Sequence, residues 1–150
     1  MCMRCDGYSW EEIERHTDLV IRVHGFTTVH VEGPSPWTYT IGAYESWDQP
    51  ELLVVDIEAS IQKALVHAIA EDYADFGEVG HDTLDLLDVE LAPVDESHFD
   101  DGLVAAWEGR YSLSAAAGDF VQVVPGRSWF GGGAGRVRRL DRPRSRPGAR

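Results

Sequence analysis

Two cysteines near the start of the chain have the spacing that points most directly to chemistry. Cys2 and Cys5 are the only cysteines, and they form a Cys-x-x-Cys pair. Two thiolates on a tight turn can reach one tetrahedral zinc ion, and the same spacing suits a redox pair. A zinc site needs further ligands, and no second cysteine pair follows. We take His30 as the candidate third ligand. His81 and His98 are open alternatives, and so is a pair of reduced thiols on a flexible end.

Five residues in the first half of the chain are candidates for a ligand pocket. They are Trp37, Tyr39, Thr40, Gly42 and Glu51. Gly42 ends the alternation of a strand, so a ligand or another backbone could approach closely there. Glu51 stands between a proline and an apolar strand, where it could be a poised acid or base, or a solvated strand end. Tyr39 could instead be a core residue whose hydroxyl finds one partner. No phosphate-binding glycine loop and no Gly-x-Ser-x-Gly motif accompanies these residues, so they do not assign a reaction.

The elements that position these residues are marked by caps and by the spacing of apolar side chains. Ser9 and Glu12 form a capping box, which predicts a helix start. Apolar residues at helical spacing continue to Gly25, a residue typical of helix ends. Alternation and an apolar run predict the next segments. These are strands over 26–32 and 37–41, a loop over 43–50 and a central strand over 52–55.

The second half of the chain predicts one long helix and further strands. An apolar stripe from Ile57 to Tyr73 indicates a helix, which Gly77 closes. The expected later elements are a strand over 84–94, a short helix over 98–107 capped by Ser97, and a last strand over 120–124. The pattern predicts a single α+β domain over residues 1–125, with a mixed or mainly antiparallel sheet of about five strands and two main helices packed on it. The Gly-, Arg- and Pro-rich residues 126–150 are expected to be a mobile tail.

The charge is distributed unevenly along the chain. The net charge is −13, yet residues 126–150 hold eight Arg and one Asp, and residues 1–125 hold five basic and 25 acidic residues. An acidic body repels phosphates, which excludes nucleic acid as its partner and favours a basic protein. The partner of the Arg-rich tail stays open. No apolar run is long enough for a membrane helix and no signal peptide is evident, so we expect a cytoplasmic protein without a membrane partner.

Three sequence features together resemble a known family. They are Cys2-x-x-Cys5, then Tyr39-Thr40-Ile41-Gly42, then Pro50-Glu51-Leu52-Leu53-Val54 leading into the helix that contains Ile61 to Tyr73. This combination resembles the bacterial domain of unknown function 4262 family over residues 1–125. The resemblance implies a small cytoplasmic bacterial protein with no assigned reaction.

Two fainter likenesses keep other functions open. The order of the elements, including the segment His81 to Leu84, is similar to suppressor-of-fused-like domains, which implies protein binding and an immunity-like role. A threonine-rich strand followed by a proline-led apolar strand is also similar to split-barrel flavin-binding domains. The basic residues of the body are scattered, however, and none is placed to hold a flavin phosphate.

Our leading hypothesis from the sequence is a non-enzymatic acidic protein-binding module. One alternative is a metalloprotein, possibly an enzyme, that holds zinc with Cys2, Cys5 and a histidine such as His30. The other is a domain that binds a small ligand or a flavin near Tyr39 and Gly42. The sequence does not decide whether the protein is an enzyme.

Overall fold

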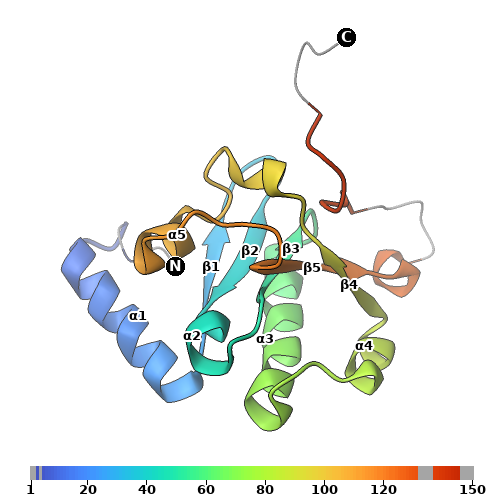
Figure 1. The fold of residues 1–150 in the computed structure, drawn as a ribbon, viewed down its shortest axis with the longest axis horizontal. Helices are drawn as coiled ribbons and strands as arrows, with labels where there is room; N and C mark the ends of the chain where they lie inside the picture. Colours follow the sequence, from blue (N-terminus) through green and yellow to red (C-terminus); the bar gives the residue numbers. More distant parts are fainter. Residues whose placement is uncertain (1–2, 4, 132–136, 146–150) are drawn as a thin grey trace.

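The centre of the molecule is a five-stranded sheet, seen in a computed structural model that describes residues 3, 5–131 and 137–145 (Figure 1). Its strands are β1 (Thr27–Val31), β2 (Trp37–Ile41), β3 (Glu51–Val55), β4 (Val89–Pro93) and β5 (Phe120–Pro125). The strand order is β1-β2-β3-β5-β4, so β1 and β4 are the edges. Neighbours are antiparallel except β3 and β5, which run parallel. The mixed sheet and the surrounding helices confirm the predicted α+β fold.

The helices begin and end where capping residues allow it. They are α1 (Trp10–His24), α2 (Ala43–Trp47), α3 (Ala59–Phe76), α4 (His81–Leu87) and α5 (Ala105–Tyr111), with short 3-10 turns η1 (Glu96–Phe99) and η2 (Arg127–Phe130). The Ser9 hydroxyl accepts from the Glu12 N–H at 3.2 Å, and the Glu12 carboxylate accepts from the Ser9 N–H at 2.7 Å. This is the predicted capping box. Gly25 and Gly77 end α1 and α3 in left-handed conformations, as predicted.

The two faces of the sheet are covered by different elements. On one face, Leu52 and Val54 of β3 pack against α3, with Val66 and Ile69 at the centre of the contact. On the other face, Leu53 and Val55 pack with residues of α1, α5 and the loops around η1. All five residues of β3 are buried, which confirms the expectation of a central strand covered on both faces. No helix in the described part of the chain is long and apolar enough to cross a membrane.

Three predicted segments differ from the structure. The expected loop over 43–50 contains α2, and the expected strand over 84–94 is divided into α4 and β4. Asp88 makes this division, because it adopts a left-handed conformation with φ of 52° and ends the helix. The expected helix over 98–107 is replaced by η1 and α5, which begins later and extends to Tyr111. In the first case a short helix was missed, and in the other two cases the turn between two short elements was missed.

The described end of the chain packs on the domain. Leu140 is only 1% exposed and belongs to the same core as Phe120 and Trp107. Residues 137–141, which lie in the stretch expected to be a mobile tail, pack on the domain in this structure. The composition there is charged, but one leucine in an arginine-rich stretch is enough to anchor it. Residues 132–136 and 146–150 lie outside the described residues.

Candidate functional site

A fully buried carboxylate lies at the start of β3. Glu51 has 0% exposure and accepts five hydrogen bonds. The donors are the Thr40 hydroxyl (2.9 Å), the backbone N–H groups of Gly42 (3.1 Å), Ala43 (2.9 Å) and Tyr44 (3.3 Å), and the Trp107 indole N–H (3.1 Å). Three of these donors are the free N–H groups at the start of α2, which favour a negative charge. Glu51 thus joins β2, α2 and α5 to the centre of the sheet.

The five predicted pocket residues are all used in packing. Thr40, Gly42 and Glu51 are joined directly by the hydrogen bonds around the carboxylate. Tyr39 is 2% exposed and its hydroxyl accepts from the Ala106 N–H at 3.2 Å. The Trp37 indole N–H donates to the Leu103 carbonyl at 2.8 Å. Because Glu51 has no exposed surface, it is neither a solvated strand end nor part of an open pocket in this structure.

We expect the stability that Glu51 contributes to decrease as the pH rises. Burial raises the pKa of Glu51 above its usual value of 4.5, although the hydrogen bonds from Thr40 and the α2 backbone oppose this shift. Between the unfolded and folded pKa values the folded state binds more protons, so this contribution is present below the unfolded value and is lost as the pH rises through the folded one. Urea unfolding of the wild type and Glu51→Gln near pH 5 and near pH 8 measures it. The difference in unfolding free energy should be smaller near pH 8, and a larger difference there would contradict the expectation.

The predicted metal ligands are not brought together by the described residues. Cys2 lies outside them, and Cys5 is exposed near the N-terminus. His30 is on β1, where its Nδ1 lies 2.8 Å from the Thr38 hydroxyl. Within residues 3, 5–131 and 137–145, no group of three or more His, Cys, Asp or Glu side chains is arranged to hold a metal ion. A zinc site that uses Cys2 stays a prediction.

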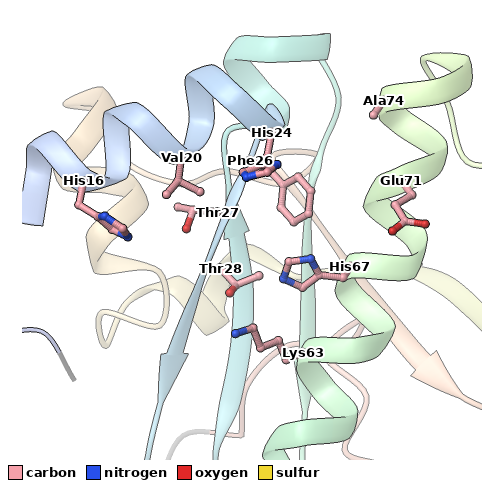
Figure 2. A pocket seen from close by; sticks show the side chains of 10 residues that line it. All are labelled: His16, Val20, His24, Phe26, Thr27, Thr28, Lys63, His67, Glu71 and Ala74. Atoms are coloured by element: carbon pink, nitrogen blue, oxygen red, sulfur yellow. The ribbon is translucent and has the colours of Figure 1, made fainter. Parts of the chain in front are cut away.

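A groove lies beside β1, between α1 and α3 (Figure 2). One part has a volume of about 440 Å³ and is lined by His16, Val20, His24, Phe26, Thr27, Thr28, Lys63, His67, Glu71 and Ala74. A second part, of about 420 Å³, is lined by Thr28, His30, Glu32, Thr38, Ala59, Ser60 and Lys63. The two parts adjoin, because both are lined by Thr28 and Lys63. Each volume is within the range of about 300–1,000 Å³ that ligand sites occupy.

The groove is lined by most of the histidine and lysine side chains of the chain. Four of the six histidines line it, and Lys63 is the only lysine in the chain. Figure 2 shows Lys63 and His67 reaching from α3 towards Thr28. The pKa of His67 is lowered, first by burial and then by Lys63, while Glu71 opposes the shift. The His67 ring packs edge-on against Phe26, with ring centres 5.1 Å apart.

A chain of hydrogen bonds decides which ring nitrogen of His30 donates to Thr38. The Gln62 amide donates to the carbonyls of Pro36 and Ile57, both at 2.9 Å, so its oxygen must accept. That oxygen accepts from the Thr38 hydroxyl at 2.8 Å. The Thr38 oxygen in turn accepts from His30, which therefore carries its proton on Nδ1.

A second surface already holds a polypeptide segment, namely residues 137–144 of the chain itself. The Gln122 side chain donates to the Arg138 carbonyl at 2.7 Å and accepts from the Leu140 N–H at 2.8 Å. The Asp95 N–H donates to the Leu140 carbonyl at 2.7 Å. The arginines of the segment pair with carboxylates of the body. These pairs are Arg138 with Asp56, Arg139 with Glu90, and Arg144 with Asp101.

The fold defines this protein as a single-domain α+β protein built on a mixed five-stranded sheet. The chain belongs to the domain of unknown function family DUF4262, whose model matches residues 20–124. The resemblance seen in the sequence is thereby confirmed, although the cysteine pair lies outside the matched residues. The likeness to suppressor-of-fused-like domains stays a prediction. Searches of curated proteins and of solved structures gave no match.

The sequence did not reveal either surface. His16 and His24 belong to α1 and His67 belongs to α3, and these two helices are far apart in the sequence. Their helical spacing was a usable signal only within each helix. Gln122 carried no signal at all, because a polar residue inside an apolar strand does not indicate what it binds.

Proposed function

We propose that this protein is a non-enzymatic binding module for arginine-rich, extended polypeptide segments. The observation that supports this most directly is the seating of its own residues 137–144. The segment is contacted by Asp56, Glu90, Asp95, Asp101 and Gln122. These residues lie within the part of the chain matched by the family model, and the segment lies outside it. The binding surface therefore belongs to the family domain, and this chain supplies an internal example of what fits it.

The contacts of the segment are of two kinds. Leu140 and the segment backbone are buried and hydrogen-bonded, and the arginines form exposed ion pairs. The Leu140 side chain fills a buried position. Gln122 bonds the Leu140 N–H and the Arg138 carbonyl, and the Asp95 N–H bonds the Leu140 carbonyl, so the backbone of the segment is satisfied much as a neighbouring strand would satisfy it. The paired arginine side chains are between 45% and 51% exposed. Ion pairs at such exposure contribute at most about 1 kcal/mol each, so the leucine and Gln122 provide most of the affinity and the arginines provide attraction and specificity.

The contacts of residues 137–144 suggest which sequence the basic partner expected from the acidic body would carry. Such a partner would present two arginines followed by a large apolar residue in an extended chain. It would compete with residues 137–144, whose tether keeps their effective concentration on the order of millimolar. Residues 137–144 thus occupy the surface unless a partner displaces them. Only a partner that binds more tightly or has a high local concentration does so.

The proposal is tested by cutting the internal segment free. A protease site replaces residues 132–135 of the full chain, the protein is cleaved, and the two pieces are refolded with an excess of a labelled peptide of residues 137–150. We expect saturable binding by fluorescence anisotropy. The same peptide with Leu140→Ala should bind at least about tenfold more weakly, because a buried leucine truncated to alanine costs about 2–5 kcal/mol. A peptide with Arg138→Gln and Arg139→Gln should bind a few-fold more weakly and with less salt dependence.

A peptide of the same composition in scrambled order is the matched control. Equal binding of the scrambled and native peptides would reduce the effect to nonspecific charge attraction and contradict the proposal. Failure of the cleaved segment to bind at any concentration, with the body still folded by circular dichroism, would contradict it as well.

A further inference from the structure

The groove beside β1 crosses the open edge of the sheet. It is lined by α1, whose Ile21 packs on one face of the sheet, and by α3, whose Val66 packs on the opposite face. A hollow that touches both helices must pass around the strand between them. Thr27 and Thr28 are consecutive residues of β1, so their side chains point to opposite faces, and both line the groove.

The backbone of β1 is unpaired on the groove side. All five residues of β1 pair with β2 on its other side. Elsewhere in the described chain, no backbone group forms a backbone hydrogen bond with β1. The opposite edge, β4, carries features that discourage strand pairing, namely Pro93 and a charged Glu90 that is paired with Arg139. The sequence of β1, Thr-Thr-Val-His-Val, has neither proline nor a permanent charge.

The shape of the site selects a single strand. Because the edge is recessed between α1 and α3, the sheet of a second copy with its own flanking helices is too wide to approach it. A lone extended segment is narrow enough, and five residues of strand span about 17 Å. Its backbone would complete the hydrogen bonds of β1, and its side chains would point alternately towards α1 and α3.

The charges on the α3 wall give the segment a defined pattern. Lys63, His67 and Glu71 follow at intervals of four residues, so they form one column that faces the groove. Lys63, which is positive, and Glu71, which is negative, are eight residues apart, which is about 12 Å along a helix. Two strand residues at positions i and i+4 point to the same face and are about 13 Å apart. An acidic residue at one of these positions and a basic residue at the other would match the column.

We propose that the edge of β1 binds an extended segment of a partner protein as a sixth strand, and that this segment carries opposite charges at positions i and i+4. The acidic side chain pairs with Lys63 and the basic side chain pairs with Glu71. This site is separate from the surface that holds residues 137–144, and its ligand differs in charge from the arginine-rich segment.

The test uses the full-length protein and two peptides of about nine residues with alternating threonine and valine. One peptide has Glu and Lys at positions i and i+4, and the other has the same composition with the charges at i and i+3, which point to opposite faces. We expect the first to bind at least about twofold more tightly by anisotropy, since the second peptide can form only one of the two charge pairs and each exposed pair contributes about twofold or more. At saturation, hydrogen exchange of amides on the open side of residues 27–31 should slow at least tenfold, on the order expected when edge amides join a ladder.

A charge reversal tests the contact with Lys63. The variant Lys63→Glu should bind a peptide with lysines at both i and i+4 more tightly than the wild type does, and Arg22→Glu, which is exposed on α1 and does not line the groove, should show no such reversal. Lys63→Gln serves if the reversal perturbs the fold, and it should weaken binding of the matched peptide. Equal affinity for the two first peptides, binding without slower exchange in β1, or no binding at millimolar concentration would each overturn the proposal.

Discussion

Replacing Glu51 with alanine should lower the free energy of unfolding by about 4 kcal/mol. The substitution removes the acceptor of five hydrogen bonds in a position with no access to solvent. Three orphan N–H groups at the start of α2 and the Trp107 indole N–H would be left buried without a partner. Each such donor costs about 1–3 kcal/mol, and partial relaxation of the short helix α2 limits the sum.

Guanidinium unfolding at neutral pH measures this loss as a lower midpoint at unchanged slope. Glu14→Ala is the matched control, because Glu14 is exposed on α1 and its removal should change the stability by no more than about 0.5 kcal/mol. A Glu51→Ala variant as stable as this control would show that the carboxylate is not the anchor of α2 and α5. The tryptophan emission should also change in Glu51→Ala, since Trp107 loses its hydrogen-bond acceptor.

The parts of the fold that the sequence predicted well are those coded by neighbouring residues. The capping box at Ser9, the glycines after α1 and α3 and the alternation from Trp37 to Ile41 each depend on residues a few positions apart. Local chemistry decides them before any tertiary contact forms. The errors at α2, α4 and α5 concern helices of five to seven residues. Helices this short depend on tertiary contacts, so propensity alone does not reveal them.

The candidate sites were less predictable because they join distant residues. Glu51, Thr40 and Gly42 lie together in the structure, and Trp107, which donates to the carboxylate from 56 residues away, gives no sign of this contact in the sequence. The groove requires α1 and α3 to sit on opposite faces of one edge strand. That arrangement follows from the strand order, which the hydrophobic pattern does not contain.

The two proposed binding surfaces depend on which face and which edge of the sheet other parts of the chain cover. The apolar face over β5 is covered by the chain's own residues 137–141, while β1 is left open at the bottom of a groove. Both surfaces would recognise extended polypeptide, one through a leucine anchor and one through an unpaired strand edge. The net charge of −13 would speed the approach of basic partners to the surface over β5, whereas the β1 edge would select a segment that carries both signs of charge.

Leu140→Ala should lower the free energy of unfolding by about 3 kcal/mol. Leu140 is 1% exposed and shares a core with residues from both halves of the chain. A leucine in a solvated tail would give no measurable change, so the result separates a packed segment from a mobile one. Leu86→Ala provides the control, because Leu86 is 86% exposed and the same atoms are removed. If both variants were as stable as the wild type, residues 137–141 would not belong to the core, and the binding surface inferred from them would lose its main support. A large loss in Leu140→Ala alone would establish that the domain extends beyond the matched family region to include the segment that its own acidic surface holds.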